Sequence, residues 1–338
     1  MKKNKTKIDK VILVTGAGGY IGSVLVPELL KKNYSVLALD KFFFGNTIKT
    51  HKNLKKIKID CRKIDAKYFK GLYAVIDLVG ISNDASGERF KSITWEVNFR
   101  SRLKTAKLAK KNNVRRYILP SSCSIYGFQK KIVTENSKVN PLTTYAKSNF
   151  KAENAIRKLA DKNFCVTIVR QATIFGFSPR MRFDLAINGM TEGAYRTLKL
   201  PLMRDGNQIR PLCHVKDTCR LQVQLLETDE KKINNQIFNV GSKKCTKKIL
   251  DFAKIVSSCF KKRPKIEWYG DPDHRSYDVS FEKLKKINFK TKFDIKMGVE
   301  EILSMLKQKK LKKTKKNITL EWYKHLQNKG IFLKTDKF

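Results

Sequence analysis

Short apolar runs alternate with amphipathic stretches along the first half of the chain. Runs rich in Val, Ile and Leu at 11–16, 34–40 and 73–80 have the length and β-branched content of buried strands. Segments 21–33 and 94–113 carry apolar residues at the spacing of helices. This alternation predicts repeated strand–helix–strand units, and therefore a parallel sheet that is covered by helices on both faces.

The same rhythm continues through the middle of the chain. Strands are predicted at the end of 52–60, at 114–122 and at 164–176, and a helix is predicted at 145–163. After Gly176 the pattern loosens, and the sequence indicates loops and short helices. The change of pattern at Gly176 therefore predicts two parts: a regular strand–helix part before it and a less regular part after it.

The expected fold class is α/β, with a Rossmann-type doubly wound parallel sheet and a smaller C-terminal substrate-binding part. Residues 1–177 are predicted to form the dinucleotide-binding domain, and the segment of about 211–243 is predicted to return to it. Residues 178–210 and 244–338 are predicted to form the substrate-binding part, which ends in a basic tail.

Charge is the unusual feature of the composition. The 338 residues include 73 Lys and Arg against 30 Asp and Glu, for a formal net charge of +43. Most of this excess is lysine spread along the chain, and only 307–317 forms a dense block, without interleaved aromatic residues. A solvated basic surface is therefore favoured over a dedicated nucleic-acid site, because base reading and phosphate grip favour Arg and stacking aromatics.

Cysteine spacing and hydropathy indicate the cellular compartment of the protein. Seven cysteines are scattered without a C-x-x-C pair, so the sequence predicts neither a metal site nor a disulfide framework. No run of about 18 apolar residues exists, and no membrane span is expected. The apolar run after the basic start is too short for a signal peptide, so a cytoplasmic location is expected.

The first predicted strand leads into a glycine-rich turn, "VTGAGGYIG". Gly16, Gly19 and Gly22, with Tyr20 and Ile21 between the last two, stand where the strand gives way to a helix. Glycines at such a turn allow close backbone approach, and the helix N-terminus offers N–H groups to a pyrophosphate.

An acid follows at the end of the second predicted strand. Asp40 could accept hydrogen bonds from an adenosine ribose and would repel a 2′-phosphate, which favours NAD over NADP as the cofactor. A purely structural glycine turn with a surface aspartate is the alternative reading of Asp40 and the turn.

Four motifs together carry a family resemblance. The pieces "TGAGGYIG", "SSCSIYG", Tyr145 on a helix ending in "KAE", and "RPLCHVKD" resemble the extended short-chain dehydrogenase/reductase family. The similarity is to its branch of NAD-dependent nucleotide-sugar epimerases and dehydratases, and it runs from about residue 10 to about 290. The resemblance implies that NAD is the cofactor and that a nucleotide diphosphate sugar is the substrate.

The resemblance also implies roles for individual residues. Ser122 matches the residue that hydrogen-bonds the reacting sugar oxygen, and Tyr145 matches the base that takes the proton of the sugar hydroxyl. The other implied cofactor contacts are Asp60 and Cys61 near the adenine, Leu78, Val79, Gly80 and Ile81 near the nicotinamide, and Asn98 as a structural polar residue. The implied substrate contacts are Ser122, Cys123, Ser124, Arg180, Asn188, Arg210 and Arg275.

Each of these residues has a plainer alternative. Ser122 could cap a turn, Tyr145 could be a core aromatic, and the arginines could be surface charges. His214 in "RPLCHVKD" is interpreted as a packed structural histidine, because the resemblance assigns the base to tyrosine.

One position departs from the family pattern Tyr-x-x-x-Lys. The residue four places after Tyr145 is Asn149, and Lys147 lies about 200° away around a helix, so it is a poor substitute. In the family the lysine holds the nicotinamide ribose and lowers the tyrosine pKa through its charge. Three accounts stay open: a slower enzyme, another lysine such as Lys130 or Lys151 reaching the site, or a non-catalytic binder of NAD or sugar nucleotide.

The resemblance narrows the reaction. Where the dehydratases have an Asp-Glu pair, this chain has Cys123 and Ser124, which disfavours dehydration. Epimerisation by transient oxidation of a sugar hydroxyl is the first choice, and a nucleotide-sugar dehydrogenase or ketoreductase is the alternative. The family also implies a homodimer that pairs the helices at 94–112 and 145–162.

Overall fold

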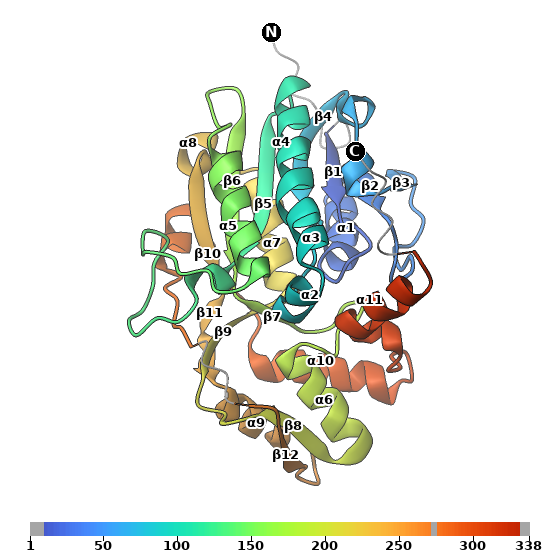
Figure 1. Ribbon diagram of the computed structural model, residues 1–338, viewed down its shortest axis with the longest axis vertical. Helices are drawn as coiled ribbons and strands as arrows, with labels where there is room; N and C mark the ends of the chain where they lie inside the picture. The colour runs from blue at the N-terminus through green and yellow to red at the C-terminus, as the bar shows by residue number, and fades with distance from the viewer. Residues whose placement is uncertain (1–9, 272–275, 332–338) are drawn as a thin grey trace.

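A seven-stranded parallel sheet forms the centre of the computed structural model, which describes residues 10–271 and 276–331 (Figure 1). The strand order is β10-β6-β5-β4-β1-β2-β3, and every neighbouring pair is parallel. The predicted Rossmann-type doubly wound α/β fold is confirmed. The strands of this sheet are β1 (Val11–Thr15), β2 (Ser35–Asp40), β3 (Leu54–Lys58), β4 (Leu72–Asp77), β5 (Arg116–Ser122), β6 (Cys165–Gln171) and β10 (Gln236–Val240).

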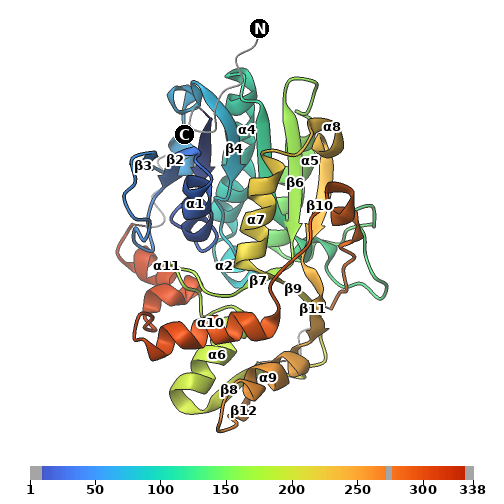
Figure 2. The same ribbon diagram turned by 180° about the vertical axis from the view of Figure 1, so that it is seen from behind.

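Helices cover both faces of the sheet because its strands are apolar on both sides. Helices α1 and α7 lie on one face and helices α4 and α5 on the other, as the two opposite views show (Figures 1 and 2). Two separate apolar clusters fill the layers between sheet and helices. The helices of this part are α1 (Gly22–Lys31), α2 (Asp84–Arg89), α3 (Lys91–Trp95), α4 (Arg102–Lys111), α5 (Thr144–Arg157), α7 (Val215–Leu225) and α8 (Glu230–Ile233).

Two predicted elements are interrupted in the structure. The helix expected at 94–113 contains a π-helical segment, Glu96–Ser101, between α3 and α4. The Ser101 hydroxyl donates to the carbonyl of Val97 at 2.7 Å, and such a back-bond loosens the regular ladder. The strand expected at 164–176 divides at Ala172: its backbone N–H still donates to the carbonyl of Val240 in the main sheet, whereas Thr173 pairs with Leu212 in a second sheet.

The C-terminal part has a core of its own beside the sheet. Strand β7 (Thr173–Phe175) leaves the main sheet and pairs with β9 (Ile209–His214), which also pairs with β11 (Ser242–Lys248). Strand β8 (Lys199–Met203) pairs with β12 (Lys265–Tyr269). Between β9 and β11 the chain returns to the main sheet as α7 and β10.

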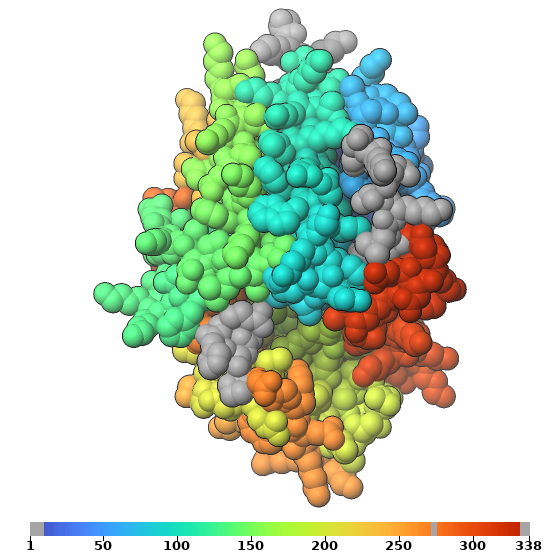
Figure 3. All heavy atoms as spheres, in the orientation of Figure 1, coloured from blue at the N-terminus to red at the C-terminus, as the bar shows by residue number. Residues whose placement is uncertain are grey.

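Four helices complete this part. They are α6 (Ala186–Thr197), α9 (Ile249–Ser258), α10 (Ile295–Lys307) and α11 (Thr319–Asn328). Apolar residues at helical spacing bury one side of α10. Helix α11 lies against the region of α2, on the face shown in Figure 3. In the described ranges, no helix has the length and apolar character needed to cross a membrane.

The buried ion pair between α5 and β6 gives a test of this fold. Glu153 and Arg170 approach to 2.9 Å, and their side chains are 1% and 4% exposed. Arg170→Met should lower the free energy of unfolding by about 3–5 kcal/mol, because the carboxylate is left buried without its partner. Denaturant titration measures this loss.

An exposed pair serves as the control. Lys324→Met breaks the pair with Glu321, whose side chain is 53% exposed, and should cost less than about 1 kcal/mol. Equal losses in the two variants would contradict the assignment of Glu153 and Arg170 as a structural pair.

Candidate active site

The glycine turn after β1 approaches a neighbouring strand very closely. Gly16 has φ +64°, and a Cβ atom there would lie 2.7 Å from the backbone nitrogen of Val79. A Cβ on Gly22 would lie 2.4 Å from the carbonyl oxygen of Ala17. Only glycine therefore fits these positions, and the predicted turn is shaped as a close-packed cradle at the start of α1.

A cavity of about 470 Å³ opens beside this turn. It lies at the carboxyl ends of the sheet strands and extends towards the C-terminal part, which is the place where open α/β sheets bind ligands. The predicted site residues that line it are Gly16, Gly19, Tyr20, Ile21, Gly22, Asp40, Asp60, Cys61, Leu78, Val79, Gly80, Ile81, Asn98, Ser122, Ser124, Tyr145, Asn149, Arg180 and Arg210.

Two predicted residues that the structure describes, Asn188 and Cys123, do not line this cavity. The amide of Asn188 contacts Gly176, Tyr20 and Arg182, and the side chain is fully buried. Cys123 is buried, and its thiol donates to the carbonyl of Arg170. Arg275 lies outside the described residues.

The two acids near the predicted adenosine end differ in their surroundings. Asp40 accepts a hydrogen bond from the backbone N–H of Gly18 at 3.0 Å, and burial raises the pKa of its carboxyl group. Burial also acts to raise the pKa of Asp60, but hydrogen bonds from Arg62 and Lys41 outweigh it, and the net pKa is well below the usual range. Asp60 is thus already paired within the protein at 2.6 Å and 3.0 Å.

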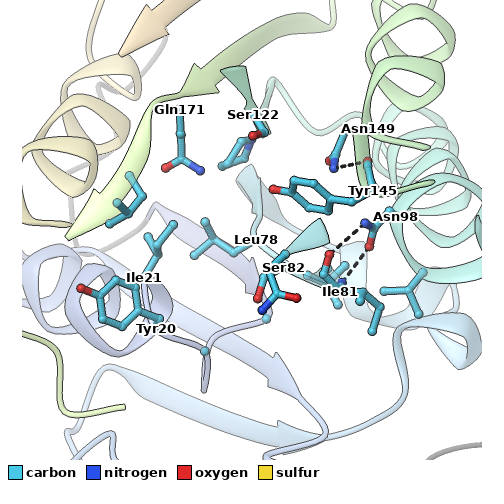
Figure 4. Close-up of a pocket in the computed structure, with 18 of the residues that line it drawn as sticks. Tyr20, Ile21, Leu78, Ile81, Ser82, Asn98, Ser122, Tyr145, Asn149 and Gln171 are labelled. Atoms are coloured by element: carbon cyan, nitrogen blue, oxygen red, sulfur yellow. Dashed lines mark hydrogen bonds between the residues drawn. The ribbon is translucent and has the colours of Figure 1, made fainter. Parts of the chain in front are cut away.

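The loop after β4 is fixed from behind by Asn98. The Asn98 side chain accepts from the backbone N–H of Ile81 at 2.8 Å and donates to the carbonyl of the same residue at 3.1 Å (Figure 4). Asn98 is fully buried, as its interpretation as a structural polar residue expects. It therefore sets the wall of the cavity formed by Leu78, Val79 and Gly80.

Ser122 and Tyr145 project into the cavity from neighbouring elements (Figure 4). Ser122 ends β5, and its hydroxyl accepts from the N–H of Ser124 at 3.1 Å. Tyr145 is the second residue of α5, whose N-terminus is capped by Thr143. Gly87 of α2 lies directly behind Tyr145, because a Cβ there would be 2.9 Å from the Cβ of Tyr145.

Several groups act on the acidity of Tyr145. Burial raises the pKa of its hydroxyl above the ordinary value, and the charge of Asp84 acts in the same direction. A side-chain interaction with Ser122 and the charges of Arg102 and Arg182 lower the pKa, but less than burial raises it. The raised pKa means that the charged phenolate form of Tyr145 is disfavoured. The phenol can act as a base only where a cation offsets the free-energy cost of that charged form.

Asn149 lies one turn after Tyr145 and is 3% exposed. Its amide nitrogen donates to the main-chain carbonyl of Tyr145 at 2.8 Å, which is visible in Figure 4. Its amide oxygen accepts from the guanidinium of Arg102 at 2.8 Å. The other lysines considered, Lys130 and Lys151, are exposed and do not line the cavity.

Arg180 presents a buried guanidinium to the same cavity. The side chain stacks on Phe44, with 3.5 Å between the guanidinium carbon and the ring centroid, and one nitrogen donates to Thr319. In the described part of the chain, its Nε and Nη1 atoms have no hydrogen-bond partner. Burial and the charge of Arg182 lower the pKa of Arg180 to about 10. Donors without partners beside a cavity suit an anionic group such as a phosphate.

Sequence reasoning missed several lining residues. Arg102 from α4, the buried pair of Arg182 and Asp184, and Tyr323 from α11 all contribute to the cavity. The segment around Tyr323 does carry apolar residues at helical spacing, and this signal could have identified α11. Arg102 and Arg182 gave no comparable signal among so many basic residues.

The fold and the site together define a dinucleotide-binding α/β protein with a serine and a tyrosine facing one cavity. The model of the NAD dependent epimerase/dehydratase family matches residues 12–241. The chain belongs to this family, and its predicted membership is confirmed.

Curated relatives match along most of the chain. A UDP-glucuronate 4-epimerase of Thermodesulfobacterium geofontis is 25% identical over 315 residues, which cover 88% of this chain and 96% of the relative. A UDP-glucose 4-epimerase of Bacillus subtilis is 24% identical over 322 residues, which cover 86% and 94%.

Solved structures match equally broadly. A UDP-glucuronic acid 4-epimerase from Bacillus cereus, in complex with UDP-glucuronic acid and NAD, superposes with a TM-score of 0.80 at 22% identity, and the match covers 88% of this chain and 99% of that one. MoeE5 in complex with UDP-glucuronic acid and NAD gives a TM-score of 0.80 at 20% identity, with coverages of 88% and 99%. At these identities the likeness establishes the fold.

The pair of Arg182 and Asp184 predicts an acid-dependent contribution to stability. Burial raises the pKa of Asp184, but the charge and hydrogen bonds of Arg182 outweigh it, so the net pKa lies below its usual value. The stabilisation is therefore present above the unfolded-state pKa of about 4 and is lost as the pH falls through the folded-state value. Asp184→Asn should cost about 3 kcal/mol at neutral pH, and the difference from wild type should shrink in acid.

Thermal and denaturant unfolding at neutral and acidic pH measure this change. Asp65→Asn removes the charge of an exposed acid paired with Lys67 and should have a much smaller effect at either pH. A cost of Asp184→Asn that is independent of pH would contradict the electrostatic origin.

Proposed function

We propose that the protein is an NAD-dependent nucleotide-sugar epimerase. The observation that carries the proposal is that Ser122 and Tyr145 face the same cavity as the glycine turn after β1. Membership of an NAD-dependent family and relatives named as UDP-sugar 4-epimerases support it. Transient oxidation at a sugar hydroxyl requires a dinucleotide site and a proton acceptor in one place, and the cavity offers both.

The residues at the cavity fit a dinucleotide. The glycine turn leaves room for a pyrophosphate at the N-terminus of α1, and the carboxylate of Asp40 suits the hydroxyls of a ribose. The Nε and Nη1 atoms of Arg180, which have no hydrogen-bond partner in the described part of the chain, suit an anionic group of a cofactor or substrate. NAD, when bound, supplies the hydride acceptor and donor of the reaction.

The protein side chains handle the proton. In this proposal Tyr145 accepts the proton of the sugar hydroxyl, and Ser122 hydrogen-bonds the oxygen that becomes a ketone. Arg210 lines the substrate end of the cavity and is proposed to contact the diphosphate of the sugar nucleotide. Asn188 is proposed to act only on the cavity wall, because its amide already has three partners.

Dehydration is disfavoured by the residues that follow Ser122. Cys123 does not line the cavity, and burial strongly raises the pKa of its thiol. Ser124 lines the cavity but is a hydroxyl without an acidic neighbour in the motif. Release of the oxidised sugar, as in a dehydrogenase or ketoreductase, is the alternative outcome at the same site.

Turnover of UDP-sugars tests the proposal. Incubation of NAD-loaded protein with UDP-glucose, UDP-glucuronic acid and UDP-N-acetylglucosamine should give one 4-epimer without net NADH formation. Tyr145→Phe should lower the rate by roughly 10²- to 10⁴-fold, because the proton acceptor is lost. NMR of the sugar anomeric signals and absorbance of NADH follow the two outcomes.

Tyr195→Phe is the matched control, because that tyrosine is exposed on α6. Steady accumulation of NADH would indicate the dehydrogenase alternative. Saturable NAD binding without turnover of any sugar would instead support a non-catalytic binder, the function that Asn149 brought into consideration.

We also propose a homodimer that pairs α3 and α4 with α5. Trp95, which ends α3, and Phe99, in the π-helical segment between α3 and α4, are half-buried and meet edge to face, with ring centroids 6.2 Å apart. Light scattering at micromolar concentration should give the mass of two chains, and Phe99→Glu should give the mass of one. Phe128→Glu, at an exposed loop position, is the control, and a monomeric wild type would contradict the proposal.

A further inference from the structure

A tyrosine that works as a base in a buried site needs a nearby positive charge. Burial raises the pKa of Tyr145, because its charged form loses contact with water. Without a compensating cation the phenol would stay protonated at neutral pH, and proton transfer would be slow. Position 149, one helical turn away on the same face, carries a neutral amide.

Arg102 lies next to that amide. It begins α4, is 4% exposed and lines the same cavity as Tyr145. Its Nη1 atom donates to the side-chain oxygen of Asn149 at 2.8 Å, and its Nε atom donates to the carbonyl of Val79 at 2.8 Å. A Cβ on Gly80 would lie 3.6 Å from its Nη2 atom. The guanidinium is thus wedged between the loop after β4 and helix α5.

The hydrogen bonds that hold Arg102 leave its charge in place. Its guanidinium donates to the main-chain carbonyl groups of Val79 and Asp77 and to the side-chain amide of Asn149, all of which are neutral acceptors. Arg182 also faces Tyr145, but it forms an ion pair with Asp184 at 2.6 Å. A cation held by neutral groups acts more strongly on its surroundings than one paired with a carboxylate.

Acidic side chains also lie near Arg102 and Tyr145. Asp77 is the acid beside Arg102: its carboxyl oxygens accept hydrogen bonds from the hydroxyls of Thr15 and Tyr117, and burial raises its pKa against the opposing charge of Arg102. Asp84 raises the pKa of Tyr145 through its charge. Glu88 accepts a hydrogen bond from the backbone N–H of Thr144 at the start of α5. Two cations lower the pKa of Tyr145 by charge, and within the described ranges Arg102 is the one whose guanidinium forms no ion pair with a carboxylate.

Local structure explains how Arg102 reaches this place. The residue directly follows the π-helical segment Glu96–Ser101, where the wider turn changes the direction in which the next side chain leaves the helix. The carbonyl of Arg102 accepts from the hydroxyl of Tyr117 at 3.2 Å, which ties this turn to β5. A π-helical turn of this kind often marks a functional site.

We propose that Arg102 supplies the positive charge that activates Tyr145, and that Asn149 is the positioning residue that holds its guanidinium beside the phenol. The inference rests on the proposed function, because it assigns a partner to the base of that reaction. The positive charge beside Tyr145 then comes from α4 and not from α5. This explanation of Asn149 differs from a slower enzyme, a lysine from elsewhere and a non-catalytic binder.

Charge removal at Arg102 gives the first test. In Arg102→Gln the titration of Tyr145 should move to higher pH, which NMR of protein labelled at the phenolic carbon of tyrosine follows, with Tyr145→Phe identifying the signal. kcat/KM at neutral pH should fall by roughly 10- to 100-fold, and the gap should narrow as the pH rises. A merely structural role would not move the titration.

Arg100→Gln is the matched control, because Arg100 precedes Arg102 by two residues and its side chain is 68% exposed beside Glu96. It should leave the titration of Tyr145 unchanged. An unchanged titration in folded Arg102→Gln, as judged by NAD binding and thermal unfolding, would overturn the proposal.

Asn149→Lys gives the second test. The substitution removes the amide that holds Arg102 and brings a cation of its own, so one charge takes the place of another and kcat/KM should rise by less than about threefold. In the Arg102→Gln background the same lysine should restore the titration of Tyr145 and most of the lost activity. A gain of about a hundredfold from Asn149→Lys alone would show that the native site lacks a cation and would refute the proposal.

The proposed function and the proposed role of Arg102 can be contradicted separately. If no sugar nucleotide is converted, the proposed function fails, while the titration of Tyr145 still reports on Arg102. If Arg102→Gln does not fold, Asn149→Lys decides alone: a small shift of the Tyr145 titration supports the proposal, and a large shift to lower pH overturns it.

Discussion

The direction of the chain on either side of β1 determines where this protein can bind a ligand. From β1 the chain goes first to β2 and β3 and then crosses to β4 on the other side, so the segments after β1 and β4 separate at their carboxyl ends. A crevice must open there, and the close approach of Gly16 to Val79 closes its floor. Every proposed contact of cofactor or substrate is a contact with this crevice.

The electrostatics of the crevice follow from its burial. Charges on buried side chains are screened less by water, so the arrangement of Arg102, Arg180 and Arg182 matters more here than the large charge on the surface. Arg182 is neutralised by Asp184, whereas Arg180 keeps N–H groups without partners in the described part and Arg102 is held by neutral acceptors. The three guanidinium groups therefore suit three tasks: structure, anion binding and support of a phenolate.

Local motifs were sufficient to predict the framework of the site. The glycine turn follows β1, Asp40 and Ser122 end their strands, and Tyr145 lies in the first turn of α5, so the sequence pattern could place all of them at one edge of the sheet. Arg102 could not be predicted in this way, because its position depends on the π-helical turn before it and on hydrogen bonds to the carbonyl groups of Asp77 and Val79. Helix α11 was missed because a lysine-rich block precedes it and conceals the apolar spacing that includes Tyr323.

The replacement of a lysine by an asparagine at position 149 fits a wider trend in this chain. In the described ranges six arginines are buried, whereas each lysine keeps some exposure: the six are Arg62, Arg102, Arg116, Arg170, Arg180 and Arg182. A guanidinium is more weakly hydrated than an ammonium and can donate to several fixed acceptors at once, so it is the cation more easily taken out of water. A protein that confines lysine to its surface would need a guanidinium wherever its interior requires a charge. Arg102, held by the amide of Asn149, meets that requirement beside Tyr145.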